Sequence, residues 1–85
     1  MDTVRIMLVE DHQIVREGLR RMLELSPDML VVGEASNGEE ALNQIASVSP
    51  DIVITDIKMP GMDGIELIRR VKQAYPACAV LVLTL

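Results

Sequence analysis

Cysteine and long apolar runs are scarce in this 85-residue sequence. Its one cysteine, Cys78, cannot form an intramolecular disulfide, and one cysteine is too few for a cysteine-rich zinc site. The apolar run near the start, residues 6–9, is too short for a signal-peptide core or a transmembrane helix. We therefore expect a cytoplasmic protein in a reducing compartment, with no contact to a membrane.

Basic residues are also few. Eight Lys and Arg stand against 13 Asp and Glu, which gives a net charge of −5, and the basic residues gather in no cluster larger than Arg69, Arg70 and Lys72. A surface that binds nucleic acid needs concentrated positive charge. We do not expect this chain to bind nucleic acid directly.

Two phosphate-binding patterns are absent as well. Gly33 and Gly38 belong to neither a Gly-x-Gly-x-x-Gly nor a Gly-x-x-x-x-Gly-Lys pattern, so a dinucleotide or P-loop site has no support. His12 is the sole histidine, and no second histidine or suitable serine pattern accompanies it. We interpret His12 as a solvent-facing residue at the start of a helix.

What is present has the composition of a folded domain. Hydrophobic residues make up 49% of the chain and charged residues 25%, the balance of a globular protein. A chain of 85 residues holds one domain, because separate domains rarely run below about 50 residues each.

Short β-branched runs alternate with helical patterns along the chain. The apolar runs predict strands over residues 4–10, 29–35, 52–55 and 79–83. Apolar residues at helical spacing predict helices over residues 13–24, from 39 to the stop at Ser49 and Pro50, and from 65 to Tyr75. The alternation predicts an α/β fold with a mainly parallel sheet and helices on its faces. Ligands of such sheets bind beyond the carboxyl ends of the strands.

Acidic residues stand at two of these strand ends. Glu10 and Asp11 follow the first predicted strand and Asp56 follows the third, so a parallel sheet places three carboxylates at one edge. Clustered carboxylates repel each other unless a cation lies among them. Mg²⁺ is the natural cation, because it takes oxygen ligands and is commonly held by one or two carboxylates together with phosphate oxygens. The sequence therefore predicts a Mg²⁺ site at this edge.

Two of the candidate residues, Asp11 and Thr84, also have a simpler interpretation. Taken alone, Asp11 is better explained as a cap of the first helix. Asp56 is different, because it lies between a buried strand and a proline-glycine loop, and a carboxylate held there can attack phosphorus to form an aspartyl phosphate. Thr84 would donate its hydroxyl to a phosphoryl oxygen, although Thr is common in strands for its β-branching. For Lys58, only the backbone carbonyl is predicted to reach a metal.

At this point the residues resemble a known family. Residues 6–12 (IMLVEDH) look like the first strand and acidic pair of response-regulator receivers, and residues 54–64 (ITDIKMPGMDG) match their phosphorylation loop closely. Residues 15–19 (VREGL) and 31–35 (VVGEA) resemble the NarL/LuxR-type subfamily. The resemblance covers nearly the whole chain and implies a doubly wound, flavodoxin-like or CheY-like sheet.

The resemblance also implies a function. Asp56 would take a phosphoryl group from a phosphohistidine on a sensor histidine kinase, and Thr84 would follow that group as a switch residue. Mg²⁺ would be bound by Asp11, Asp56 and the carbonyl of Lys58, with Glu10 helping through water. The chain would be a phosphorylation switch and not an enzyme, and it would normally control a DNA-binding transcription-regulator domain.

The resemblance ends early. A complete receiver continues through a fourth helix, a fifth strand and a fifth helix, and the family's phosphate-pairing lysine and aromatic switch residue have no counterpart in this sequence. Lys58 and Lys72 lie in the wrong places to substitute for the lysine. Residues 1–85 are therefore expected to be the amino-terminal part of a receiver, without the DNA-binding domain.

Two other functions compete with this interpretation. A Mg²⁺-dependent phosphatase of the haloacid-dehalogenase type also uses an aspartate after a strand, but its pattern is Asp-x-Asp, whereas this chain has Asp56, Ile57 and Lys58. The second is a non-signalling fragment of a receiver.

Residues 80–83 carry no charge, Pro or Gly, and as an edge strand they would invite pairing with another chain. We therefore expect self-association.

Overall fold

The computed structural model describes residues 3–83, and every predicted element is present. The chain order is β1 (Val4–Val9), α1 (Gln13–Leu23), β2 (Met29–Ala35), α2 (Gly38–Val48), β3 (Ile52–Asp56), α3 (Gly64–Ala74) and β4 (Ala79–Leu83). None of the described helices is long and apolar enough to cross a membrane. The predicted bounds differ from the observed ones by one residue at several ends. Glu10 has left β1, Glu24 is the C-cap of α1, and Asp56 still belongs to β3.

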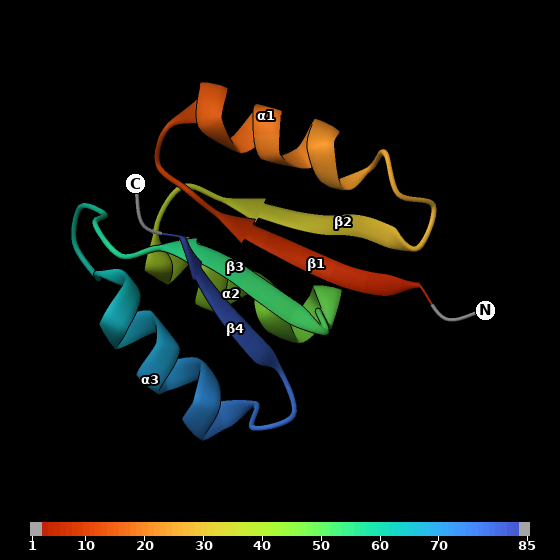
Figure 1. Ribbon diagram of the computed structural model, residues 1–85. Helices are drawn as coiled ribbons and strands as arrows, with labels where there is room; N and C mark the ends of the chain where they lie inside the picture. The colour runs from red at the N-terminus through yellow and green to blue at the C-terminus, as the bar shows by residue number, and fades with distance from the viewer. Residues whose placement is uncertain (1–2, 84–85) are drawn as a thin grey trace.

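The four strands form one parallel sheet in the order β2-β1-β3-β4. This order confirms the predicted doubly wound fold, because the chain moves outward from β1 to β2 and then returns to the other side of β1 for β3. Figure 1 shows α1 on one face of the sheet and α2 and α3 on the other. The reversal of strand order lies between β1 and β3, which is where ligands bind in sheets of this kind.

The two faces of β1 bury different cores. Met7 and Val9 pack in the cluster that includes residues of α2 and α3, whereas Ile6 and Leu8 pack on the side of Leu19 and Leu23 of α1. Each of these four β1 side chains is at most 2% exposed. Burying an aliphatic side chain of this size stabilises a fold by about 1.5–3 kcal/mol. The strand that leads into Glu10 and Asp11 is therefore firmly held by both faces of the sheet.

Strand β2 contains an extra residue opposite β1. Ile6 is paired with Val31 and Met7 with Gly33, so Val32 has no partner in the register. A bulge of this kind reverses the faces to which the following side chains point. Glu34, paired with Leu8, consequently faces α1.

Local capping sets where α2 and α3 begin. The side chain of Asn37 accepts a hydrogen bond from the backbone N–H of Glu40, and the side chain of Asp63 accepts one from the N–H of Glu66, at 2.8 Å and 2.9 Å. Both caps satisfy donors that a helix leaves unpaired in its first turn. The cap at Asp63 fixes where the loop after β3 ends, and so bounds the segment that follows Asp56.

Candidate functional site

The ends of β1 and β3 lie side by side at the carboxyl edge of the sheet. Val9 of β1 is paired with Thr55 of β3, so Glu10 and Asp56 each follow a paired residue at the same level. On the other side of β3, Asp56 is paired with Leu83 of β4. The register thus places the acid-bearing ends of β1 and β3 together, as the sequence predicts for a parallel sheet.

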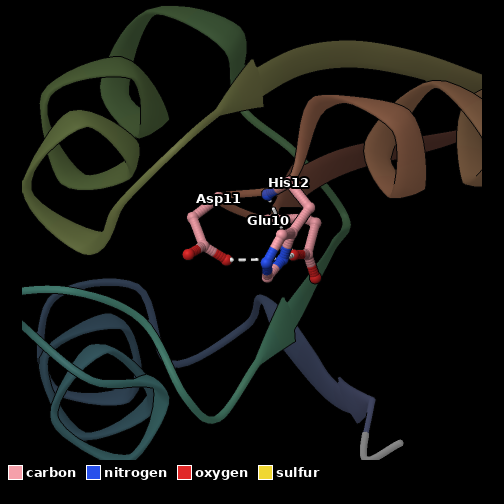
Figure 2. Close-up of side chains that lie close together, drawn as sticks. All are labelled: Glu10, Asp11 and His12. Atoms are coloured by element: carbon pink, nitrogen blue, oxygen red, sulfur yellow. Dashed lines mark hydrogen bonds and ion pairs between the residues drawn. The ribbon is translucent and has the colours of Figure 1, made fainter.

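Glu10, Asp11 and His12 form a compact cluster in the turn between β1 and α1. One ligand atom from each of the three lies within 4.8 Å of the others. Figure 2 shows the ring of His12 between the carboxylates of Asp11 and Glu10. The Nδ1 atom of His12 lies 2.7 Å from Oε1 of Glu10 and 3.1 Å from Oδ1 of Asp11. Asp56 is not a member of this cluster.

Glu10 is the buried member of the cluster. The residue is 4% exposed, and its Oε1 also accepts a hydrogen bond from the backbone N–H of His12 at 3.0 Å. A buried carboxylate requires such partners, because it has left the water that would solvate it. The contacts hold the Glu10 carboxylate in the turn, beside Asp11.

Asp11 has one oxygen that forms an ion pair with the His12 ring but accepts no hydrogen bond within residues 3–83. Its Oδ1 is buried, and it accepts no hydrogen bond from the residues that the structure describes, since the nearby Nδ1 of His12 is engaged with Glu10. The alternative that Asp11 caps the first helix is wrong, because the N-cap of α1 is His12 and no side chain caps it. A buried carboxylate oxygen that accepts no hydrogen bond is able to bind a cation in addition to its contact with the His12 ring.

The prediction for His12 is confirmed in part. His12 is the N-cap of α1 and its side chain is 68% exposed, but its ring contacts the two acids. The hydrogen bond to Glu10, and then the negative charge of Asp11, raise the pKa of the His12 imidazole above its ordinary value. The imidazole is therefore protonated more readily beside these two carboxylates than it would be in water.

Asp56 is the last residue of β3, and a tightly folded loop follows it. Its Oδ1 accepts a hydrogen bond from the backbone N–H of Lys58 at 3.3 Å, and its backbone oxygen accepts one from the hydroxyl of Thr55 at 2.9 Å. Asp56 is partly exposed and Lys58 is exposed. A carboxylate that is anchored by the loop and still partly exposed is suited to meet an incoming ligand.

Two glycines allow the loop after Asp56 its course. Gly61 has φ +77°, a left-handed conformation that side chains rarely adopt. At Gly64, the first residue of α3, an added Cβ would lie 2.3 Å from the backbone oxygen of Asp56. The N–H of Gly64 donates to the carbonyl of Ile57 at 2.8 Å. The start of α3 is thereby packed directly against the backbone of the residue that ends β3.

The oxygen donors at this edge fit a hard divalent cation. Two adjacent carboxylates, one of them with a buried oxygen that accepts no hydrogen bond from the described residues, match the preference of Mg²⁺ for oxygen ligands. The roles predicted for Asp56 and for the carbonyl of Lys58 stay predictions. Thr84 lies outside the described residues.

Comparison with known proteins identifies the family to which this chain is similar. Residues 6–85 match the response regulator receiver domain. The transcriptional regulatory protein LiaR of Bacillus subtilis is 41% identical over 81 residues, which are 95% of this chain and 38% of LiaR. The nitrate/nitrite response regulator protein NarL of Escherichia coli is 40% identical over 68 residues, which are 80% of this chain and 32% of NarL. The chain spans less than half the length of these relatives.

Solved structures agree with the sequence relatives. A two-component response regulator of the LuxR family from Aurantimonas sp. SI85-9A1 has a TM-score of 0.90 and 46% identity, and the match covers 95% of this chain and 58% of that one. A signal receiver domain of NarL from Mycobacterium tuberculosis has a TM-score of 0.90 and 39% identity, over 96% of this chain and 66% of that one. The chain therefore belongs to the response regulator receiver domain family, among regulators of the NarL/LuxR type.

Proposed function

We propose that this chain is a phosphorylation switch, in which Asp56 accepts a phosphoryl group from a phosphohistidine of a sensor histidine kinase. The observation that carries the proposal is the meeting of two strand ends. Asp56 ends β3 next to the turn that carries Glu10 and Asp11, where a buried oxygen of Asp11 accepts no hydrogen bond from the described part of the chain. The loop after β3 returns so that Gly64 packs against the backbone of Asp56, which holds Asp56 in place.

The proposed step is a substitution at phosphorus. A carboxylate oxygen of Asp56 attacks the phosphorus atom, and an O–P bond forms as the N–P bond to the donor histidine breaks. The electron pair of the broken bond stays on the ring nitrogen of the donor. The product is an aspartyl phosphate at the carboxyl edge of the sheet.

Mg²⁺ is the proposed cofactor of this step. Asp11, Asp56 and the backbone carbonyl of Lys58 would bind the ion, with Glu10 acting through water. When bound, the ion offsets the negative charge of the acids and draws an anionic phosphoryl group toward them. The hydroxyl of Thr84 is proposed to donate a hydrogen bond to the transferred phosphoryl group.

The relatives suggest what the switch controls. LiaR is named a transcriptional regulatory protein, and NarL a nitrate/nitrite response regulator. We therefore propose that phosphorylation of this chain regulates transcription in the cytoplasm, through a DNA-binding domain. In this role the chain is a signalling partner of a kinase, and not an enzyme with a separate substrate.

Phosphorylation with a small donor tests the proposal. The protein is incubated with acetyl phosphate, with Mg²⁺ or with a chelator, and its intact mass is measured. We expect the mass of one phosphoryl group to be added only when Mg²⁺ is present. An unmodified mass in a sample shown by circular dichroism to be folded, or labelling that is equal in the chelator, would refute it.

Asp11 is expected to account for most of the Mg²⁺ affinity. Asp11→Ala removes the buried oxygen that accepts no hydrogen bond among residues 3–83, and loss of even a residue that only orients a metal ligand costs roughly ten- to a hundredfold in affinity. We therefore expect the dissociation constant of Mg²⁺, followed by backbone amide shifts in an NMR titration, to rise at least tenfold.

The matched control for Asp11→Ala is Asp28→Ala. Asp28 is an exposed acid just before β2, at the opposite end of the strands, so the change in net charge is the same. The control should leave the Mg²⁺ titration unchanged. Equal dissociation constants for both variants and the parent would place the ion away from Asp11.

We also propose that the chain self-associates through β4. Among residues 3–83, β4 is paired with β3 alone, so its outer edge presents unpaired backbone groups. Leu81 in the middle of the strand is 53% exposed. An uncharged, apolar edge strand is a template for pairing with a second copy.

A lysine on the edge should weaken this association. Leu81→Lys places a charge in the middle of β4, a device with which natural edge strands avoid pairing. Analytical ultracentrifugation over a concentration series should show more monomer for Leu81→Lys than for the parent. Leu25→Lys is the control. Leu25 is 83% exposed and follows α1, which packs on β2 at the opposite edge of the sheet from β4. A parent protein that stays monomeric throughout the series would contradict the proposal.

A further inference from the structure

Arg16 connects the acidic turn to the middle of the fold. This residue of α1 donates from Nη1 to the backbone carbonyl of Glu10 at 2.7 Å and from Nε to Oε1 of Glu34 at 3.1 Å. Its side chain is 18% exposed, so water competes little for the guanidinium. Hydrogen bonds from an ionised donor are about twice as strong as neutral ones.

Glu34 can serve as the anchor because of the bulge in β2. Val31, which precedes the bulge, and Glu34, which follows it, both face α1, although residues three apart in a regular strand point to opposite faces. The second carboxylate oxygen of Glu34 accepts from Nη1 of Arg20 at 3.0 Å. The backbone carbonyl of Glu34 accepts from the side chain of Gln44 of α2 at 3.1 Å. Glu34 is thus fixed from both faces of the sheet.

The bond from Arg16 completes the hold on the acidic turn. The backbone N–H of Glu10 donates to the carbonyl of Ala35 at 3.0 Å. The carbonyl that Arg16 contacts belongs to the peptide group joining Glu10 to Asp11, so its orientation sets the direction in which Asp11 leaves the strand. With both backbone groups of Glu10 bound, the turn has little freedom to rotate.

We infer that Arg16, anchored by Glu34, is a positioning residue for the Mg²⁺-binding carboxylates of Glu10 and Asp11. The inference rests on the Mg²⁺ site of the proposed function. Outer partners that orient metal ligands affect affinity through geometry, and their loss costs roughly ten- to a hundredfold in metal affinity. An ion pair that only ties α1 to β2 would affect stability and leave the affinity unchanged.

Arg16 and Arg20 provide a matched comparison. Arg16→Gln and Arg20→Gln each remove one guanidinium from Glu34, but only Arg16 contacts the Glu10 carbonyl. The free energy of unfolding from urea denaturation and the Mg²⁺ dissociation constant from NMR titration are measured for both. We expect both variants to lose stability, Arg16→Gln more because it also loses the bond to Glu10, with a dissociation constant raised roughly tenfold or more by Arg16→Gln and changed less than about twofold by Arg20→Gln.

Arg16→Lys covers the case in which Arg16→Gln does not fold. A lysine keeps the positive charge beside Glu34 and lacks the fork that serves two acceptors, so this variant should fold and still bind Mg²⁺ more weakly than Arg20→Gln does. Equal Mg²⁺ affinities in the Arg16 and Arg20 variants, beside a parent that binds, would overturn the inference alone. A folded parent that binds no Mg²⁺ would overturn the proposed site and the inference together.

Discussion

Asp56→Asn is expected to abolish phosphorylation by acetyl phosphate in the presence of Mg²⁺. The substitution keeps the size of the side chain and its ability to accept the hydrogen bond from the Lys58 N–H. It removes the anionic oxygen that attacks phosphorus. Intact-mass measurement should show one added phosphoryl group on the parent protein and none on the variant.

Asp63→Asn is the control for this loss. Asp63 lies in the same loop and caps α3, a task that asparagine performs as well as aspartate. The control should be labelled as fully as the parent. Labelling of Asp56→Asn to the level of the parent would show that the phosphoryl group goes to another residue.

Gly64→Ala is expected to destabilise the protein by about 3 kcal/mol, at the upper end of the usual cost of overpacking. The new Cβ would lie 2.3 Å from the backbone oxygen of Asp56 and 2.8 Å from Cα of Ile57. Both are backbone atoms in a buried place, so no side chain can turn aside to relieve the clash. The end of β3 or the start of α3 has to move, and urea denaturation followed by circular dichroism measures the loss.

Gly18→Ala should have the opposite effect. Gly18 lies inside α1, and an added Cβ would meet no atom within 4 Å. Alanine loses less backbone freedom on folding than glycine does, so a helix gains roughly 0.5–1 kcal/mol from this substitution. A Gly64→Ala variant as stable as Gly18→Ala would mean that α3 does not begin against Asp56.

The fold was predictable because its signals are local. Runs such as Met29–Ala35 are short and β-branched, and proline at position 50 stops a helix pattern at a definite place. A strict alternation of these patterns leaves few arrangements other than a parallel sheet with helices on both faces. Differences of one residue remained at Glu10, Glu24 and Asp56, where side-chain and backbone contacts decide the ends.

The convergence of acids followed from the same alternation, but their contacts did not. Parallel strands end at one edge, which brings Glu10 and Asp56 together whatever their side chains do. The turn of the His12 ring onto Glu10 and Asp11 depends on the backbone angles of a three-residue turn. No periodic pattern in the sequence encodes those angles.

The roles of Arg16 and Glu34 were hidden for another reason. A regular strand over residues 29–35 would point Val31 and Glu34 to opposite faces, so periodicity alone sends Glu34 away from α1. The unpaired Val32 reverses this, and a single extra residue in a strand carries no signal in an apolar run. Gly64 was placed in the loop of residues 54–64, whereas its close contact with Asp56 appears only in three dimensions.

The most direct test of the phosphorylation switch is to find the residue that carries the phosphoryl group. Borohydride reduces an aspartyl phosphate to homoserine, and it leaves free carboxylates and phosphates on hydroxyl groups unchanged. The protein is labelled with acetyl phosphate and Mg²⁺, reduced, digested and sequenced by mass spectrometry. Homoserine at position 56 is the predicted result. Homoserine at position 11 or 63 instead, or a labelled protein that yields no homoserine, would contradict it.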